Sequence, residues 1–230
     1  MHKTQAIVLY KQLWKESSFL VHLLTPDLGV IQAIVQGARK QKSQFNAQFE
    51  IGNLLEIIIT KSQNAAIYKI TSSSIISQLY IVGKPYTLLL SIQAALELYK
   101  QLVFSAEESQ KFFNLLITFL EYIQTVNNNH LLVIWRFLIR LTDELGFPIV
   151  TWDGVQYIIN DRDVYLNKYD INFLETVDSW LILLPSTSKL INEFNIINPS
   201  CSVFNVFIFE WFELHLNKKI THKAMKLFFS

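Results

Sequence analysis

Near its N-terminus the chain reads IVLYKQLWKESSFLVHLLTPDLGVIQAIVQGARKQKSQF, from Ile7 to Phe45. Within this stretch, short runs of Ile, Val, Leu and Phe are separated by turn residues, which is typical of β-strands. Pro26 and Gly29 bound a tight turn between two runs, because proline presets one φ angle and glycine tolerates a positive one. The stretch therefore predicts strands joined by short connections, and it decides the fold of the first third of the chain.

The rest of the first third carries strand signals of the same kind, and no helical pattern of useful length precedes Gln44. Five short antiparallel strands either close into a barrel or leave exposed edges, and a small barrel of the oligonucleotide-binding (OB) type is one common solution. Residues 1–80 are therefore predicted to form an OB-type, nucleic-acid-binding domain. The expected strands are Ala6–Leu9, Phe19–Leu24, Val30–Val35, Leu54–Thr60 and Ile67–Thr71.

From Pro85 onward the apolar residues recur at helical spacing. Pro85 suits the first turn of one helix, Ser105 is expected to cap the next, and a third ends at Gly146. Residues 149–169 read as an irregular or β-like insertion. The prediction is an α+β protein with a five-stranded barrel at 1–80 and an all-helical domain at 84–230 that contains this insertion. Later helices are expected at Ile171–Leu184, Val203–Leu216 and Thr221–Phe228.

The composition indicates a globular protein rather than a disordered one, since 51% of its 230 residues are hydrophobic and 17% are charged. Its longest uncharged runs, Ile70–Gly83 and Phe194–Phe209, contain polar residues and are too short for a membrane span. No secretory signal is recognisable at the N-terminus. The single cysteine, Cys201, can form neither an internal disulfide nor a structural zinc site. We therefore expect a cytoplasmic protein with no membrane partner.

Charge is distributed unevenly along the chain. Residues 1–80 carry eight basic and four acidic side chains, a net charge of +4, whereas the remainder carries a net charge of −3. A basic N-terminal module favours a polyanionic partner. Ordinary surface chemistry explains so small an excess equally well, and charge alone leaves both interpretations open.

Three elements of the opening stretch carry a resemblance to a known family. They are the Glu16-Ser17 pair, the T-P-x-x-G pattern of Thr25–Gly29, and the G-A-R-K-Q-K-S run from Gly37 to Ser43. In this order and spacing they resemble the opening of bacterial RecO proteins. Looser likenesses follow at residues 135–147 and 211–220, so the resemblance covers nearly the whole chain and is strongest over residues 5–45.

The resemblance implies a non-enzymatic mediator of DNA repair and homologous recombination. Such a protein binds single-stranded DNA, anneals complementary strands, and helps to load the recombinase onto strands coated by the single-strand-binding protein. Its implied partners are single-stranded DNA, the acidic C-terminal tail of the single-strand-binding protein, and RecR. No cofactor is implied, and the implied location is the cytoplasm, in association with the nucleoid.

Two features depart from the family pattern. Many family members carry four cysteines after the third helix, spaced for a zinc finger, whereas residues 149–169 contain none. We therefore expect no metal there and a hairpin held by packing. A basic element near the C-terminus of the family is only partly present, as Thr221-His222-Lys223.

The first candidate site is a cluster of cations in the connection after the third expected strand. Three cations within four residues at a barrel rim suit phosphate binding, and the loop between strands one and two is expected to extend the patch. In that loop one aromatic side chain is the best candidate for stacking on a base. The alternative is a solvated charged loop. The candidate DNA-binding residues are Arg39, Lys40, Lys42, Lys11, Lys15 and Trp14.

The second candidate site concerns the acidic tail that the family binds on its helical domain. Arg136 and Arg140 lie one turn apart on the third helix, share a face, and can grip a carboxylate. An internal ion pair with Asp143 or Glu144 is an equal alternative. A further basic group could serve the tail, DNA, or the end of a helix. It consists of Lys218, Lys219 and Lys223.

Enzymatic interpretations lack a motif. The sequence contains no dinucleotide-binding or phosphate-binding glycine pattern and no H-E-x-x-H. A nucleic-acid-processing enzyme would need a metal or a nucleophile that no pattern indicates, so we expect a protein that is not an enzyme. The alternative from another class is an interaction module for the single-strand-binding protein or RecR that binds little DNA of its own.

Overall fold

The computed structural model describes residues 1–40, 43, 45, 47–61, 66–102, 106–127, 130–152, 157–159 and 200–227. The chain divides into two compact units. The first contains residues 1–85 and 95–122, and the second contains residues 86–94 and 123–230.

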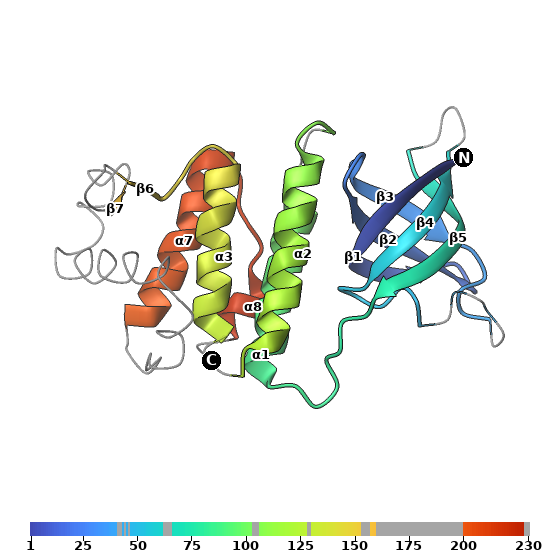
Figure 1. Ribbon diagram of the computed structural model, residues 1–230, viewed down its shortest axis with the longest axis horizontal. Helices are drawn as coiled ribbons and strands as arrows, with labels where there is room; N and C mark the ends of the chain where they lie inside the picture. The colour runs from blue at the N-terminus through green and yellow to red at the C-terminus, as the bar shows by residue number, and fades with distance from the viewer. Residues whose placement is uncertain are drawn as a thin grey trace. The chain divides into compact units, whose positions relative to one another are not determined.

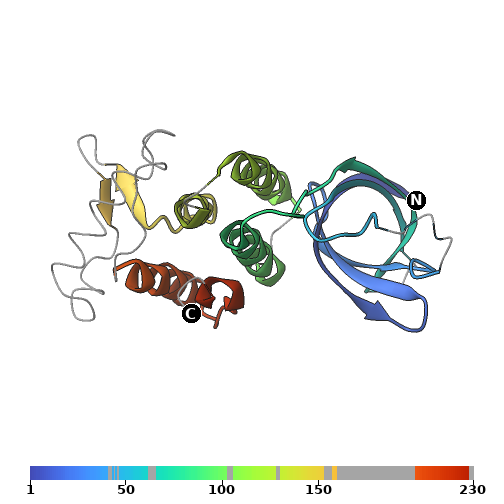
Figure 2. The same ribbon diagram turned by 90° about the horizontal axis from the view of Figure 1, so that it is seen from below.

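The N-terminal strands close into a barrel with the neighbour order β1-β2-β3-β5-β4 (Figure 1). Viewed from below, the strands form a ring (Figure 2). This confirms the predicted five-stranded OB-type barrel. The strands are β1 (His2–Trp14), β2 (Ser18–Thr25), β3 (Gly29–Val35), β4 (Leu54–Thr60) and β5 (Tyr68–Ser77).

One pair of neighbouring strands departs from the expected antiparallel arrangement. β3 and β5 run parallel, with Ala33 opposite Tyr68 and Ile34 opposite Lys69. The other four pairs are antiparallel. An odd number of strands cannot alternate in direction all the way around a closed ring, so one parallel pair is unavoidable. The expectation of five antiparallel strands was therefore wrong at the β3–β5 seam.

Strand β1 is much longer than predicted. It pairs with β4 as far as Ile7 and continues along β2 until Trp14 meets Ser18. A register shift between Val8 and Tyr10 marks a bulge, which bends a strand and increases its twist. The predicted loop at residues 11–18 was therefore wrong, and the turn is confined to residues 15–17.

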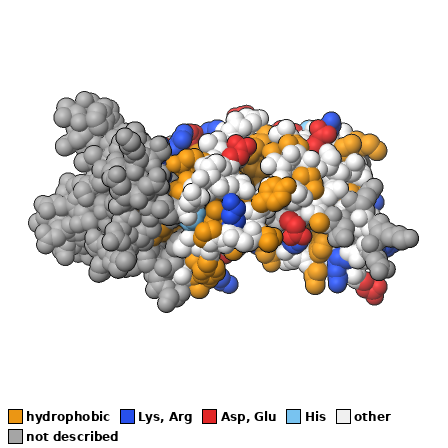
Figure 3. All heavy atoms as spheres, turned by 60° about the horizontal axis from the view of Figure 1, so that its bottom comes forward, with side chains coloured by type: hydrophobic (Ala, Val, Ile, Leu, Met, Phe, Trp, Pro, Cys, Tyr) orange, Lys and Arg blue, Asp and Glu red, His pale blue; other side chains and the backbone are white. Residues whose placement is uncertain are grey.

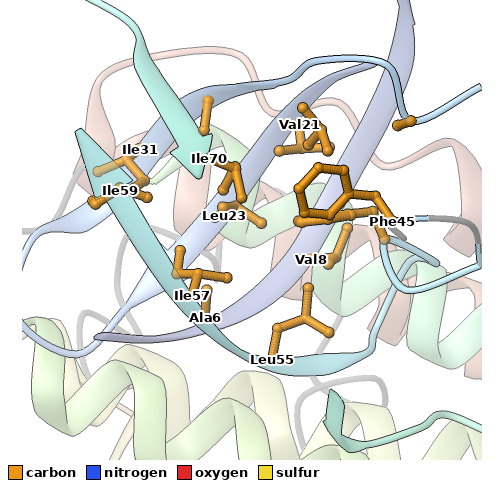
Figure 4. Close-up of a cluster of buried hydrophobic side chains, with 14 residues drawn as sticks. Ala6, Val8, Val21, Leu23, Ile31, Phe45, Leu55, Ile57, Ile59 and Ile70 are labelled. Carbon is orange, nitrogen blue, oxygen red and sulfur yellow. The ribbon is translucent and has the colours of Figure 1, made fainter. Parts of the chain in front are cut away.

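Alternate residues of the five strands point into the barrel and form its core (Figure 4). The connection between β3 and β4 adds Ala38 and the two rings of Phe45 and Phe49, whose centroids lie 6.1 Å apart edge to face. These buried side chains anchor the connection to the barrel interior. The strand residues of the core are Ala6, Val8, Val21, Leu23, Ile31, Ala33, Val35, Leu55, Ile57, Ile59 and Ile70.

Helices follow, as predicted, with a small hairpin near residue 150. The second helix begins at Ser109, four residues after the predicted cap Ser105. Ser105 itself and the predicted helix Ile171–Leu184 lie outside the described residues. The C-terminal prediction Thr221–Phe228 is represented by one short helix. The elements are α1 (Tyr86–Gln101), α2 (Ser109–Thr125), α3 (His130–Glu144), β6 (Val150–Trp152), β7 (Tyr157–Ile159), α7 (Ser200–Leu216) and α8 (Lys223–Lys226).

Buried polar contacts fix the helices of the second unit. His130, at the start of α3, has Nδ1 2.9 Å from Thr87 Oγ1, and its carbonyl accepts a bond from Ser91 Oγ at 3.2 Å. Trp211 of α7 donates its indole N–H to the carbonyl of Phe147 at 2.8 Å. In the part of the chain that the structure describes, no helix is long and apolar enough to cross a membrane.

We predict that Gly52→Ala destabilises the barrel by about 2–3 kcal/mol, because two effects combine there. Its φ is +86°, and an added Cβ would lie 2.4 Å from Leu79 Cδ2. Gly83→Ala is the matched control, since its φ is +73° and no heavy atom lies within 4 Å of an added Cβ. Positive φ alone should lower the free energy of unfolding in that variant by about 1 kcal/mol. Urea unfolding measures both, and equal losses would show that Leu79 moves aside at no cost.

Candidate nucleic-acid interface

Two connections meet at one end of the barrel. The β1–β2 turn occupies residues 15–17, and the segment after β3 begins at residue 36. The β2–β3 register places Phe19 opposite Val35, so the start of β2 lies beside the end of β3. Chain segments separated by about twenty residues in sequence are thereby brought together.

Arg39 joins these two connections through two hydrogen bonds. Its backbone N–H donates to the carbonyl of Ser17 at 3.1 Å, and its Nη1 donates to the carbonyl of Glu16 at 2.9 Å. A guanidinium has five N–H donors, so one bond to a carbonyl leaves others for an anion. Arg39 therefore both holds the β1–β2 turn and presents a charge at the surface.

The backbone around Arg39 is shaped by a tight turn. Gly37 adopts a φ of +68°, and its carbonyl accepts a bond from the N–H of Lys40 at 3.1 Å. Ala38 is buried in the core, whereas Arg39 and Lys40, which follow it, are exposed.

We name Lys15, Arg39 and Lys40 the rim cluster. All three are exposed, and the contacts of Arg39 bring the turn that carries Lys15 against the segment that carries the other two. Among the described residues of the barrel, none of the three forms an ion pair with a carboxylate. Lys42, predicted to share the site, lies outside the described residues.

Lys11 is placed differently from its prediction. It lies within β1 rather than in a loop, and its Nζ is 2.6 Å from Glu50 Oε2. The same Nζ lies 5.5 Å from the centroid of the Phe19 ring, and only 26% of the side chain is exposed. Its charge is thus already matched by Glu50, a partner that no local pattern in the sequence indicates.

Trp14, the predicted stacking residue, lies in a strand and not in a loop. Trp14 is the last residue of β1 and is half-buried, so only part of its ring is available for stacking. Leu13, opposite Phe19 on β2, is 65% exposed and was not singled out from the sequence. An exposed leucine beside a half-buried tryptophan gives the rim an apolar component next to its cations.

A second cation of the first unit is engaged with aromatic groups. Lys100, near the end of α1, has its Nζ 3.6 Å from the centroid of Tyr10, and Tyr10 meets His22 edge to face at 5.7 Å. Burial lowers the pKa of His22, and the nearby Lys100 charge lowers it further. His22 is therefore neutral at neutral pH and adds no charge to the barrel surface.

In the second unit, α3 is buried along most of its length. Arg136 is half-buried, Arg140 is exposed, and Asp143 lies almost one further turn along. Partial burial of its carboxyl and the nearby charge of Glu144 together raise the pKa of Asp143 to about 6, against the opposing effect of Arg140. The surface strip of α3 is thus two arginines followed by two carboxyl groups, and its net charge depends on pH.

The basic group near the C-terminus lies on the connection between α7 and α8 and on the first residue of α8. Asn217 ends α7 with a φ of +48°, and Glu213 Oε1 accepts a bond from the N–H of Ile220 at 2.9 Å. Three predicted lysines are exposed here, together with Lys226 of α8, which was not predicted. The predicted residues are Lys218, Lys219 and Lys223.

Charged groups on the face shown in Figure 3 stand as small separate clusters among hydrophobic and neutral surface. Within the described part of the chain, no three His, Cys, Asp or Glu side chains are close enough together to hold a metal ion. The exposed cations at the barrel rim can bind anions.

The chain is similar to known proteins over part of its length. Residues 1–79 match the family model described as "Recombination protein O N terminal". The chain is 29% identical over 146 residues to the DNA repair protein RecO of Chlorobium limicola, covering 63% of this chain and 56% of the relative. It is 31% identical over 147 residues to the protein of that name from Dehalococcoides mccartyi, with the same coverage. The chain thus spans little more than half the length of these relatives.

The pKa of Asp143 leads to a prediction about pH. Unfolded aspartates titrate near pH 4, so the folded protein binds this proton more tightly, and the free energy of unfolding falls as pH rises through about 6. Asp143→Asn should abolish this pH-dependent loss of stability. The variant should therefore have a higher melting temperature than the unmodified chain at pH 7.5 but not at pH 4.5. Glu107→Gln, which removes an exposed carboxylate from another turn, controls for the loss of any one charge. A gain for Asp143→Asn that is the same at every pH would contradict the assignment.

Proposed function

We propose that the chain is a RecO-type, non-enzymatic mediator of DNA repair and homologous recombination, on the basis of its match to the RecO N-terminal family model and its similarity to RecO proteins. In this role it binds single-stranded DNA, anneals complementary strands, and helps to load the recombinase onto strands coated by the single-strand-binding protein. Its place of action is the cytoplasm, at the nucleoid.

The observation that carries the proposal is the rim cluster. Arg39 fastens the β1–β2 turn to the segment after β3, and three exposed cations are thereby held at one end of the barrel. Each phosphate contacted by such a cation releases counterions, which supplies affinity without sequence preference. Contacts to phosphate position a strand and leave its bases available, as a mediator requires.

Annealing follows from the same contacts. Two complementary strands repel each other through their phosphates, and fixed cations reduce that repulsion while the bases remain able to pair. No bond is made or broken in the protein, so the reaction needs neither a nucleophile nor a cofactor. Lys42 belongs to the proposed DNA-binding set by its place in the sequence element, and Trp14 contributes the exposed part of its ring to stacking.

For the partner proteins we assign the helical part of the chain. Arg136 and Arg140 project from one strip of α3, and a guanidinium at the edge of an apolar helix suits the carboxylates of an acidic tail. The tail of the single-strand-binding protein is the proposed ligand, with Lys218, Lys219 and Lys223 as additional contacts. RecR is the proposed further partner.

A second candidate function is a protein-interaction module that binds little DNA of its own. The observation in its favour is the ion pair between Lys11 and Glu50, which removes one cation from the predicted patch. Under this alternative, the tail and RecR are the ligands and the rim cluster is a solvated surface.

Salt-dependent DNA binding separates the two functions. A labelled single strand of about 30 nucleotides, followed by fluorescence anisotropy, should bind with an affinity that falls linearly with salt on logarithmic axes. The double variant Lys15→Gln/Lys40→Gln should reduce the magnitude of that slope by about 1.4, because each lost phosphate contact removes about 0.7.

Lys3→Gln is the matched control, since Lys3 is an exposed lysine of the same barrel whose Nζ lies 3.0 Å from Glu56. It should leave the slope unchanged. Absence of binding by the unmodified chain at low salt would favour the interaction module. Binding with the same slope in the double variant would exclude the rim cluster as the interface.

A further inference from the structure

We propose that the DNA-binding surface does not end at the rim cluster but continues along the outer side of the parallel β3–β5 seam to Lys69 and Lys61. This inference rests on the proposed function and adds two contacts and a path for the bound strand. The seam exists because the barrel closes with an odd number of strands.

Strand register places Lys69 on this path. Ile34 and Lys69 are partners across the parallel pair, and partners in a sheet point to the same face. Ala33 and Val35 lie in the core, so Ile34 between them faces outward, and Lys69 faces outward beside it. Lys69 is exposed, and Gly37, where the rim segment turns, lies three residues beyond Ile34, roughly 10 Å along the strand.

The surface between the two groups of cations suits a nucleic-acid strand. Between the rim segment and Lys69 the outward residues are Ile34, which is half-buried, and Gln36, just after β3, which is exposed. Neither carries a charge. An amide can bond to a phosphate or a base edge, and an apolar side chain can contact a base or sugar. The path is therefore neutral and partly apolar, with cations at each end.

Lys61 lies on the other side of the β4–β5 connection from Lys69. Thr60 pairs with Lys69, so the residue after Thr60 emerges next to Tyr68. The Nζ of Lys61 lies 4.7 Å from the centroid of the Tyr68 ring, which packs against the core. This contact holds the exposed ammonium group near the end of the seam and lowers the entropy that it loses on binding an anion.

Charge pairing separates these lysines from others in the barrel. Lys3 pairs with Glu56 and Lys11 pairs with Glu50. Within the described barrel residues, Lys61 and Lys69 form no ion pair with a carboxylate. Between residues 15 and 40 the chain contains two carboxylates, Glu16 and Asp27, and Asp27 contacts His2. Two groups of unmatched cations separated by a neutral surface favour a long polyanion over a compact one.

The test compares three variants in the anisotropy titration described for the rim cluster. Lys61→Gln/Lys69→Gln should reduce the magnitude of the salt slope by about 1.4 for a strand of about 30 nucleotides. Lys15→Gln/Lys40→Gln should reduce it by the same amount, and Lys3→Gln should leave it unchanged. Each variant keeps the length of the side chain almost intact, and thermal unfolding checks that the barrel is folded.

The outcomes distinguish this inference from the proposed function. A reduced slope for the rim variant together with an unchanged slope for Lys61→Gln/Lys69→Gln would overturn the path and leave the proposed function standing. Unchanged slopes for both double variants would overturn both. An equal reduction in all variants, Lys3→Gln included, would show that only net charge matters and would also overturn the path.

Discussion

A closed ring of five strands contains at least one parallel pair, and most of the N-terminal unit depends on where that pair falls. Here it falls between β3 and β5. The seam leaves a long connection between β3 and β4, because these two strands are not neighbours in the ring. That connection supplies Phe45 and Phe49 to the core and presents Arg39 and Lys40 at the rim. The same β3–β4 connection thus both fills the barrel core and presents the cations at the surface.

The rim is held by a bond between a charged side chain and the backbone rather than by an ion pair. Arg39 donates to the carbonyl of Glu16, and this neutral acceptor leaves the positive charge uncompensated. Lys11 shows the opposite case, since its ammonium is matched by the carboxylate of Glu50. The difference matters for binding an anion, because a cation that already has a carboxylate partner must first give up that interaction. The match of residues 1–79 to the RecO N-terminal family model supports the proposed role of this arrangement in handling single-stranded DNA.

Much of the fold was predictable from local patterns. Alternating apolar residues such as Val21 and Leu23 indicate one buried face of a strand, and Gly146 after α3 marks a helix end that the structure bears out with a φ of +84°. The extension of β1 from the predicted end at Leu9 to Trp14 was not predictable in this way. Beyond Ile7 the strand no longer pairs with β4, so its residues need not alternate, and the hydrogen bonds to β2 maintain it. The start of α2 was also predicted too early, because Glu107 and Glu108 belong to a turn before the helix.

The sequence by itself determined the strand and helix periods, and hence the barrel and the helical region. It also determined the clustering of Arg39, Lys40 and Lys42, which are neighbours along the chain. Only the tertiary structure decided which cations keep their charge available. Glu50 lies 39 residues from Lys11, and Lys69 reaches the side of Ile34 through the parallel register. Alternation along a strand encodes the face on which a side chain lies but not the strand beside it, and that neighbour is chosen when the barrel closes.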